Sequence, residues 1–570
     1  MHRVLISAAH KSSGKTTISI GLCAALKQRG LIVQPYKKGP DYIDPMWLTQ
    51  ASGRACRNLD LYLMSRDDVL DTFQRHAQNA DICIVEGNKG LYDGLALDGS
   101  NSNAALAKML DLPVVLVLDA RGMTRGIAPL ILGYQAFDRD INIVGVILNN
   151  LGGSRHEGKL RAVIEHYTDV PVIGAVHNDE RLQIKERHLG LMPSNESAEA
   201  ANFIHDIGEV IAQQVDLDKL LAVTSKTKLN TPPLPCHREG EAVVVEPLKR
   251  QQPRTMERAG ERVETSDPLQ TSTPSLTLPL QGGGDKRIRI GIARDQAFGF
   301  YYADDLDALQ AAGAELVSFD TLHDAHLPDV DALYIGGGFP EMFAQELAAN
   351  SSLRNEIKSA IEADMPVYAE CGGLMYLSRS LTFHGQRHDM VGVIPGDVVM
   401  HDKPIGRGYV HLAENSEHPW PRPPLPSPPR GGGAGGEEAI EKFPSPQSSD
   451  ETTSHSTKPA GGQVAGYPAS GRGGERKNQP LIFAHEFHYS SLENLPADSR
   501  YAYRVTRGHG IDGQHDGLIY KNLLASYTHL RTIGSCYWAS RFVAFARSVK
   551  QYKMQQQLAA PEDNTPTIRL

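Results

Sequence analysis

VLISAAHKSSGKTT, Val4 to Thr17, is the stretch that decides the fold expected for the first part of the chain. An apolar run leads into a small polar loop, and a helical pattern, TTISIGLCAALKQRG, follows directly. The end of the loop matches a Walker A sequence, with Gly14, Lys15 and Thr16 in the G-K-T positions. The order strand, loop, helix therefore predicts a phosphate-binding site at the start of an α/β domain.

The chemistry of nucleotide binding explains why these residue types stand in this order. Amide N–H groups at a helix N-terminus bind phosphate, the lysine reaches the outer phosphates, and the threonine hydroxyl coordinates Mg²⁺. We expect ATP to contact Ser13, Gly14, Lys15, Thr16 and Thr17. Ala9 stands where such loops usually have their first glycine, so a plain Gly/Ser turn with a solvated lysine is the alternative.

Short apolar runs rich in β-branched residues recur through residues 1–222. After the first strand come LIVQPY, ICIVEG, PVVLVLDA, INIVGVILNN and PVIGAV, separated by helical patterns. Strands that alternate with helices predict a mostly parallel sheet covered on both faces. The expected first domain is therefore a P-loop domain of this kind.

Acidic side chains gather at the ends of two of these predicted strands. The strand predicted in ICIVEG ends at Glu86. An acidic residue at the tip of a strand next to a P-loop commonly holds Mg²⁺, so we expect Thr16 and Glu86 at a metal site. Two loops add further candidates where α/β sheets bind ligands, namely Asp41, Tyr42 and Asp44 in KKGPDYIDP and Asp93 in NKGLYDG. Loop aspartates also cap helices or face solvent, which is the alternative for each of them.

A second alternation of strands and helices begins at Arg287, with IRIGIA, AELVSF, DALYIGGG and PVYAEC, and predicts another α/β domain over residues 287–550. Residues 223–286 are rich in Pro, Thr, Arg and Gln without periodicity. Pro419 to Gly436 holds seven prolines and five glycines within a polar stretch over residues 415–479. Such compositions bury too little apolar surface to fold, so we expect a partly disordered linker, a disordered insertion and a tail over residues 551–570.

Cys371, in the sequence YAECGG, ends one predicted strand of the second domain. Gly372 and Gly373 suit a tight turn, which is how α/β sheets present nucleophiles. A helix that begins directly after the cysteine would favour the thiolate. A lone cysteine is more often a buried packing residue, so the nucleophile hypothesis depends on partners elsewhere in the chain.

Two further segments supply those partners. YIGGGFPE offers consecutive glycine amides after a strand, and we expect an oxyanion hole from Gly337, Gly338 and Gly372. His529 ends a late strand-like run, LLASYTHL, and is the candidate base. The three segments together predict a Cys–His nucleophilic site.

His485 and His488, in HEFHYS, have the HxxH spacing of some metal sites. On a strand this spacing directs the two side chains to opposite faces, and no third ligand stands out. We therefore favour a structural or substrate-proximal role over metal binding.

Composition narrows the class of protein. The chain has 570 residues, 41% of them hydrophobic, which is enough for several folding units with substantial cores. A formal net charge of −9 argues against nucleic acid as a partner, and no apolar run is long enough to span a bilayer. The six cysteines are scattered without a CxxC pair, which fits free thiols in a reducing compartment. We expect a cytoplasmic protein, with a homodimer as the oligomer to consider.

Three motifs of the first domain resemble one enzyme family in their order and spacing. GKTT, KKGPDYIDP and VEGNKGLYDG look like the ATP-binding domain of the cobyrinic acid a,c-diamide synthase family, a dethiobiotin synthetase-like branch of P-loop proteins. The resemblance implies ATP-driven amidation with Mg²⁺, in which a substrate carboxylate attacks the γ-phosphate and ammonia displaces the acyl phosphate. It also implies that Asp41, Tyr42, Asp44 and Asp93 line the acceptor and phosphoryl-transfer site.

The second domain resembles class I glutamine amidotransferases, in the subgroup that this family shares with cobyric acid synthase. The cysteine elbow, the GGG loop and His529 carry this resemblance, which implies that Cys371 forms a glutamyl thioester and releases ammonia. The subgroup typically uses a Cys–His dyad. Arg531 stands where many relatives carry a second histidine, so no third member of the site is expected there.

The resemblance covers residues 1–222 and 287–550 outside the insertion. It implies a ligase that takes ATP, glutamine and a corrinoid polycarboxylate and amidates the a- and c-side chains of cobyrinic acid. Ammonia is expected to travel inside the protein, because free ammonia is mostly protonated at neutral pH. Two alternatives stay open, namely amidation of another tetrapyrrole (hydrogenobyrinic acid or nickel sirohydrochlorin) and a P-loop switch with an inactive amidotransferase-like domain.

Overall fold

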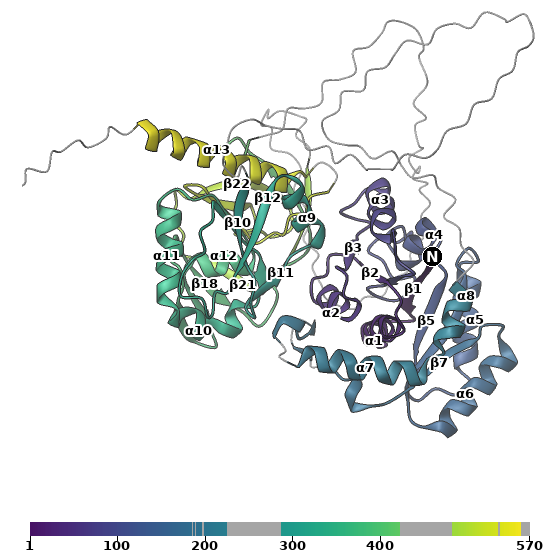
Figure 1. The fold of residues 1–570 in the computed structure, drawn as a ribbon. Helices are drawn as coiled ribbons and strands as arrows, with labels where there is room; N and C mark the ends of the chain where they lie inside the picture. The colour runs from purple at the N-terminus through teal and green to yellow at the C-terminus, as the bar shows by residue number, and fades with distance from the viewer. Residues whose placement is uncertain are drawn as a thin grey trace, which may run out of the picture.

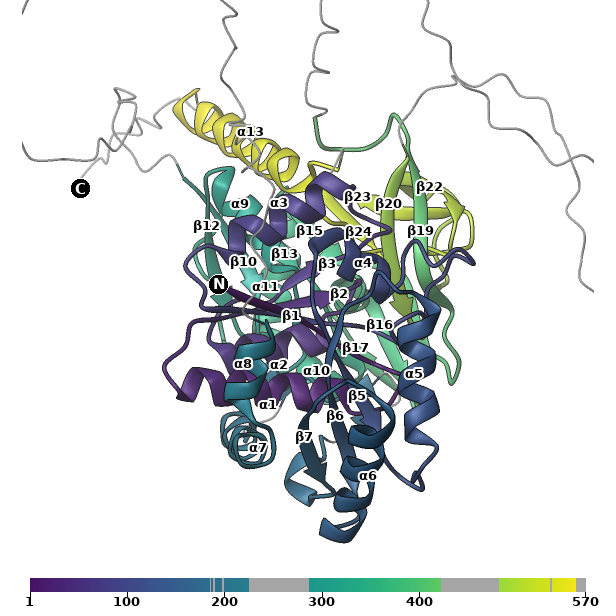
Figure 2. The same ribbon diagram turned by 90° about the vertical axis from the view of Figure 1, so that its right-hand side faces the viewer.

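A computed structural model describes residues 1–184, 186–187, 190–196, 199–224, 287–421, 481–533 and 536–559. These residues form two α/β domains that lie side by side (Figure 1). Figure 2 looks onto the first domain, with the second behind it. The prediction of two α/β domains is confirmed.

Seven strands form the sheet of the first domain: β1 (His2–Ala8), β2 (Val33–Lys38), β3 (Arg57–Leu59), β4 (Ile82–Glu86), β5 (Val114–Asp119), β6 (Ile143–Leu151) and β7 (Val172–His177). Their order is β3-β2-β4-β1-β5-β6-β7, and every neighbouring pair runs parallel, as the alternation of strands and helices predicted. Only β3 was missed, because three residues carry no periodicity to recognise.

Eight helices cover this sheet: α1 (Lys15–Gln28), α2 (Ile43–Ser52), α3 (Arg66–Ala77), α4 (Asn103–Leu110), α5 (Ile127–Phe137), α6 (Ser154–Tyr167), α7 (Ala200–Gln214) and α8 (Leu217–Thr224). Alternate strand residues point to opposite faces. Val4 and Ile6 of β1 join the core under α1, α2, α7 and α8, and Leu5 joins the core under α3 to α6. The apolar runs are therefore buried on both sides, as parallel sheets require.

The second domain has a nine-stranded mixed sheet, whose strands in spatial order are β12 (Ala314–Phe319), β10 (Ile288–Ala293), β13 (Ala332–Ile335), β15 (Val367–Glu370), β24 (Leu523–Ser526), β23 (His515–Tyr520), β22 (Arg500–Arg507), β19 (Gly406–Glu414) and β20 (Ile482–His488). The first five are parallel, and the other four extend the sheet in antiparallel fashion. The reactive residues expected in this domain follow β13, β15 and β24, so they meet at one edge of the sheet.

Helices α10 (Ala344–Ala349), α11 (Ser351–Glu362) and α12 (Gly372–Leu377) pack into one core of this domain, and α9 (Ala303–Ala311) and α13 (Trp538–Ala559) into the other. Two smaller sheets complete it, β11 (Phe298–Phe300) with β14 (Gly337–Gly338), and β16 (Ser378–Phe383), β17 (Gln386–Asp389), β18 (Ile394–Met400) and β21 (Ser490–Glu493). In the first domain a short hairpin joins β8 (Glu186–Arg187) and β9 (Gly190–Leu191).

Residues near the expected domain boundaries take part in the fold. Helix α8 continues to Thr224 and α13 to Ala559, past the expected ends at 222 and 550. Residues 415–421, where the insertion was expected to begin, lie against the second domain, with Trp420 only 2% exposed beside Trp538. The rest of the expected linker, residues 225–286, and of the expected insertion, residues 422–479, lie outside the described residues.

Polar side chains join the two domains. The guanidinium of Arg57 lies 2.9 Å from Asp304, and that of Arg531 lies 3.0 Å from the same carboxylate. The Tyr409 hydroxyl donates to Asp60 at 3.0 Å. Among the described residues, no helix combines the length and the apolar character needed to cross a membrane.

Candidate active sites

The predicted thiol site and the predicted acceptor residues Asp41, Tyr42 and Asp93 line one cavity of about 700 Å³ between the domains. Cys371 and His529 line it from the second domain, and Asp41, Tyr42 and Asp93 line it from the first. The structure thus brings together the chemistry of two sites that are far apart in the sequence.

Cys371 stands on a strained turn between β15 and α12. Its backbone has φ 49° and ψ −104°, a conformation that a residue with a side chain rarely adopts. The turn is fixed by its amide, which donates to Ser526 O at 2.7 Å. A Cβ atom on Gly373 would lie 2.1 Å from Ile335 O, so only glycine fits at this position, two residues after the cysteine. The elbow predicted from YAECGG is present.

His529 lies beside this thiol and is 3% exposed. Its backbone pairs with His485, to which its amide donates at 2.7 Å, and its Nδ1 lies 3.4 Å from Glu370 Oε2. Burial lowers the pKa of His529, but hydrogen bonds with Cys371 and Glu370 outweigh burial and raise it to about 10. The arrangement therefore favours the protonated form of His529 beside Cys371.

Glu370 is a member of the site that the sequence analysis missed. Its carboxylate accepts hydrogen bonds from Tyr368 OH (2.6 Å), Tyr334 OH (3.0 Å) and the Leu530 amide (2.9 Å). Two residues after the histidine, where many relatives carry a second histidine, Arg531 contacts Asp304 instead. The signal was the glutamate that directly precedes the cysteine at a strand end.

The three glycines expected at the oxyanion hole lie together next to His529. A Cβ atom on Gly372 would lie 3.0 Å from the Gly338 amide nitrogen, and one on Gly337 would lie 2.7 Å from His529 Cε1. A Cβ atom on Gly338 would lie 1.9 Å from Ala297 O. Only glycines allow these backbones to approach so closely.

The phosphate loop has the expected geometry. Helix α1 begins at Lys15, directly after Gly14 with φ 87°. Asn149 of β6 fixes the loop, because its Nδ2 donates to Ser13 O at 3.0 Å. Burial lowers the pKa of Lys15, while the Glu86 carboxylate opposes that shift. Helix α1 also carries Thr16 and Thr17 in its first turn.

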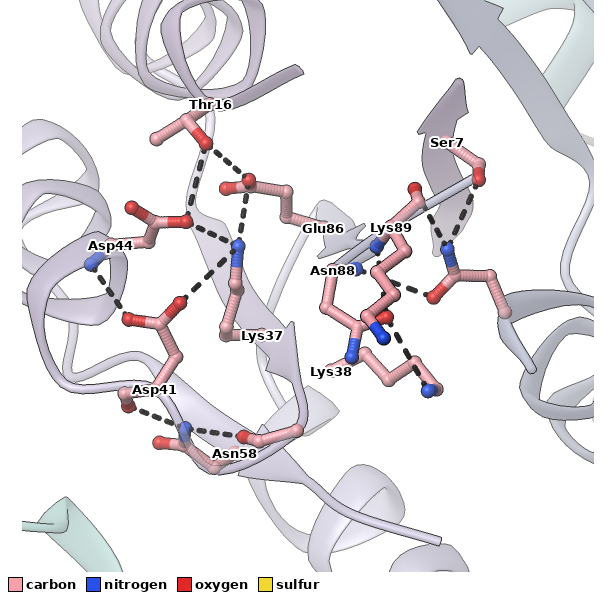
Figure 3. A network of polar contacts seen from close by, with 12 residues as sticks. Ser7, Thr16, Lys37, Lys38, Asp41, Asp44, Asn58, Glu86, Asn88 and Lys89 are labelled. Carbon is pink, nitrogen blue, oxygen red and sulfur yellow. Dashed lines mark hydrogen bonds and ion pairs between the residues drawn. The ribbon is translucent and has the colours of Figure 1, made fainter. Parts of the chain in front are cut away.

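Carboxylates and a lysine converge on Thr16 (Figure 3). The Thr16 hydroxyl donates to Glu86 Oε1 at 2.7 Å and to Asp44 Oδ2 at 3.2 Å. The Lys37 ammonium also contacts both carboxylates, with 2.8 Å to Glu86 Oε1, and lies 3.7 Å from Asp41 Oδ2. Lys37 was not predicted, although it stands in the KKGPDYIDP motif at the end of a strand.

The electrostatics of this cluster explain why a cation sits in it. Burial and the neighbouring Asp44 raise the pKa of Asp41 to about 7, and burial also raises the pKa of Glu86. Burial would lower the pKa of Lys37, but Asp44 and Glu86 outweigh burial and raise it. The acids thus keep Lys37 protonated, and its positive charge opposes the upward shift in the pKa values of Asp41 and Glu86.

The same oxygen atoms suit Mg²⁺. Glu86 Oε2 is buried and has no hydrogen-bond partner among the described residues, and the Asp44 carboxylate and Thr16 hydroxyl stand beside Glu86 Oε1. Hard oxygen ligands of this kind are those that Mg²⁺ takes in nucleotide sites. Thr16, Asp44 and Glu86 are therefore the residues that could hold the ion, which adds Asp44 to the two expected from the sequence.

The other expected residues lie around the cavity. Asp93 is exposed and accepts a hydrogen bond from the Gly90 amide at 3.0 Å. The ring of Tyr42 lies 4.3 Å from that of Tyr302 and 5.0 Å from that of His529. Tyr42 thus contacts the second domain, although its loop carries the acids of the phosphoryl-transfer site.

The HxxH pair forms no metal cluster within the described ranges. His488 lies with its Nδ1 2.9 Å from Ser490 O and stacks on Tyr527, and His485 pairs with the His529 backbone. Burial lowers the pKa of His485 to about 3, so this ring is neutral. Both histidines line the cavity, in line with a structural or substrate-proximal role.

Comparison with known proteins identifies relatives over nearly the whole chain. Residues 289–420 match the CobB/CobQ-like glutamine amidotransferase domain, and residues 59–186 match an AAA domain. Cobyrinate a,c-diamide synthase of Magnetococcus marinus is 41% identical over 547 residues, which cover 96% of this chain and 97% of the relative. The enzymes of the same name from Methanosarcina acetivorans and Archaeoglobus fulgidus are 40% and 36% identical, over 93% and 96% of this chain and 92% and 98% of theirs.

Proposed function

The chain belongs to the cobyrinate a,c-diamide synthase family and is a glutamine-dependent amide-forming ligase of cobalamin biosynthesis; we propose that it works through two active sites on facing walls of one cavity. Cys371, His529 and Glu370 would release ammonia from glutamine on one wall. The other wall carries Asp41 and Asp93, and a carboxylate of cobyrinate presented there would be activated by the phosphate loop and the acids around Lys37. The observation that carries the proposal is that Cys371 and Asp93 line the same cavity.

The glutaminase half-reaction needs a nucleophile, an acid–base group and a place for negative charge. The Cys371 thiolate attacks the amide carbon of glutamine, and the carbonyl electron pair moves to oxygen, near the amides of Gly338 and Gly372. His529 gives its proton to the leaving nitrogen as the C–N bond breaks, so ammonia departs and a thioester remains. Water then hydrolyses the thioester. Glu370 orients the imidazole and stabilises its charged form.

The amidation half-reaction uses ATP to activate an acceptor carboxylate. Lys15 and the amides at the start of α1 bind the outer phosphates, and the acceptor oxygen attacks the γ-phosphorus with loss of ADP. Mg²⁺ held by Thr16, Asp44 and Glu86 would neutralise charge on the phosphates. Lys37 holds these acids in place and offers a further positive charge beside them. Ammonia then displaces phosphate and forms the amide.

Passage of ammonia through the shared cavity fits the chemistry. Ammonia in bulk water is mostly protonated at neutral pH and is then no nucleophile. A path between two walls of one cavity keeps it from that equilibrium. The described cysteines are all free, which supports a cytoplasmic location. A homodimer stays a prediction.

Paired variants test the two-site assignment. Cys371→Ser should abolish glutamine-dependent diamide formation but keep ATP-dependent amidation with ammonium salts, because only the ammonia source is lost. Lys15→Ala should abolish amidation with either nitrogen source. The products are counted by mass after incubation of cobyrinate with ATP and Mg²⁺. Loss of ammonium-dependent amidation in a folded Cys371→Ser variant, or wild-type turnover by Lys15→Ala, would contradict the assignment.

A further inference from the structure

The cavity extends beyond the two reactive sites, and its walls there combine aromatic rings with cations. Lys38, Tyr62 and Lys89 come from the first domain, and Arg407, Tyr409, Phe487 and Arg507 come from the second. The reaction steps above use none of these side chains. Their place between the domains, next to Asp93, suggests that these side chains contact the acceptor substrate.

The apolar part of this region is an aromatic wall formed by Tyr62, Tyr409 and Phe487. The rings of Tyr62 and Tyr409, one from each domain, stack with centroids 4.0 Å apart and planes 20° apart. Both hydroxyls are fixed: that of Tyr409 donates to Asp60 at 3.0 Å, and that of Tyr62 lies 2.7 Å from His411 Nε2. The three rings are only partly buried and line the cavity, so they offer a surface to a large, flat and mostly apolar ring system.

The polar part is a cation group formed by Lys38, Lys89, Arg407 and Arg507. Lys38 is 6% exposed, and its ammonium reaches only the amide oxygen of Asn88, at 3.4 Å, among the described residues (Figure 3). The other three are exposed, and the guanidiniums of Arg407 and Arg507 lie 5.8 Å and 5.5 Å from the ring centres of Phe487 and Tyr62. Within the described ranges, none of the four has an ion pair with a carboxylate.

Unpaired cations at one place need an explanation in a chain with a formal net charge of −9. Burial lowers the pKa of Lys38 to about 8, although Asp60 acts in the opposite sense, so the buried ammonium lacks full compensation. A ligand with several carboxylates would supply that compensation from the cavity side. The four cations come from both domains, so one such ligand would bridge them.

We propose that the macrocyclic acceptor binds with its ring system against the aromatic wall, while the cation group pairs with the carboxylates that are not being amidated. This inference rests on the proposed function and adds the location of the acceptor and the groups that recognise its periphery. The wall and the cations select a rigid polycarboxylate over a small dicarboxylate, because only a large ring reaches both domains at once. An acceptor whose peripheral carboxylates are methyl esters should bind weakly, because a neutral ester cannot form the ion pairs.

Direct binding of cobyrinate to the full-length protein, followed by its visible absorption without ATP or glutamine, tests the proposal. Each of Arg407→Gln and Arg507→Gln should raise Kd roughly fivefold, and the double variant roughly twentyfold, as for partly exposed charge pairs. The double variant should also show a weaker dependence of Kd on salt. Arg504→Gln is the matched control, because Arg504 is exposed on the same strand β22 but does not line the cavity.

Other readouts separate recognition from a structural effect. The kcat/KM for glutamine hydrolysis, the Kd of ATP and the melting temperature should be unchanged in the arginine variants. The inference alone is overturned if the wild-type protein makes the diamide while the double variant binds cobyrinate as tightly as wild type. It is also overturned if Arg504→Gln weakens binding equally. If the wild-type protein neither binds nor amidates cobyrinate, the proposed function itself fails.

Discussion

Glu370 and Glu86 occupy equivalent places in the two domains, each buried at the carboxyl end of a central parallel strand. The hydrogen-bond partners of the two carboxylates differ. Glu370 is held by two tyrosine hydroxyls and an amide and stands beside His529, so the groups of the thiol site are already assembled. Glu86 is held by Thr16 and Lys37, and one of its oxygens has no partner among the described residues.

The difference teaches how each site relates to its substrates. On the proposed assignment, the thiol site carries its own nucleophile and proton donor, so it needs only glutamine and water. The phosphate site has an internal lysine among the acids that would hold Mg²⁺, so its final arrangement awaits ATP and the ion. Tyr42 and the shared cavity lie between the two sites, so we expect the coupling of the two reactions to depend on them.

Removal of the internal lysine should break the phosphate site and leave the thiol site intact. Lys37→Met should lower ATP-dependent amidation with ammonium roughly 100- to 1,000-fold, because the buried acids lose their cation and repel the phosphates. Glutamine hydrolysis should be kept. Lys27→Met, at an exposed position of α1, is the control. Normal amidation by Lys37→Met would show that the lysine only fills space.

Removal of the Glu370 carboxylate should impair the thiol site and leave the phosphate site intact. Glu370→Gln should lower kcat/KM for glutamine hydrolysis roughly 100-fold and leave ammonium-dependent amidation unchanged. Glu370 helps to raise the pKa of His529 to about 10, so wild-type His529 stays protonated up to that pH. Without the carboxylate that pKa falls, and the loss of activity at alkaline pH should begin at lower pH.

The pH profile is the readout that distinguishes positioning from packing. Glu362→Gln, exposed on α11, should leave both rate and profile unchanged. An unshifted alkaline limb in Glu370→Gln would mean that Glu370 only supports the fold around Cys371.

Removal of the ring between the sites should disturb their coupling more than either chemistry. Tyr42→Leu loses the contacts with His529 and Tyr302. We expect the number of glutamines hydrolysed per amide formed to rise roughly fivefold, at the low end of usual coupling energies. The measurement compares glutamate and diamide yields in one reaction. Tyr167→Leu, an exposed position of the first domain, is the control, and an unchanged ratio in Tyr42→Leu would remove this ring from the coupling.

The smallest effect is expected from the insertion. Deletion of residues 422–479 should leave both activities within about twofold and the melting temperature within about 3 °C, because Leu412 and Ile482 pair at the end of the β19–β20 hairpin and a short loop can join them. Deletion of residues 415–479 should cost about 3 kcal/mol, because Trp420 packs on Tyr368 and Phe542. Equal stability of the two deletions would contradict this packing.

Local patterns were enough to predict the parallel sheet, the phosphate loop and the cysteine elbow. An apolar run such as ICIVEG predicts a buried strand by itself. Gly14 and Gly373 predict backbone positions where a side chain would not fit. Local patterns could not predict which side chains that are far apart in the sequence contact each other in the fold. Glu370 meets His529, Lys37 meets Glu86, and Arg507 meets a tyrosine of the other domain, and none of these long-range contacts follows from a local pattern.

Two expectations show the same limit. Asp41, Tyr42 and Asp44 were expected in one loop, but α2 begins at Ile43, the acids lie around Lys37, and the tyrosine lies against His529. Trp420 stands in a proline-rich run that predicted disorder, and it is buried because Trp538 and Phe542 lie beside it. Composition is a property of one segment, whereas the burial of a residue depends on the other parts of the fold that pack against it.

The most direct test of the account is the origin of the amide nitrogen. Glutamine labelled with ¹⁵N in its side-chain amide is supplied with ATP, Mg²⁺ and cobyrinate, together with unlabelled ammonium at a concentration too low to support amidation without glutamine, and the label in the diamide is measured by mass. If ammonia passes through the shared cavity, both amides of the product should carry ¹⁵N almost completely. Dilution of the label to its share of the total ammonia would contradict an internal path between Cys371 and the phosphate site.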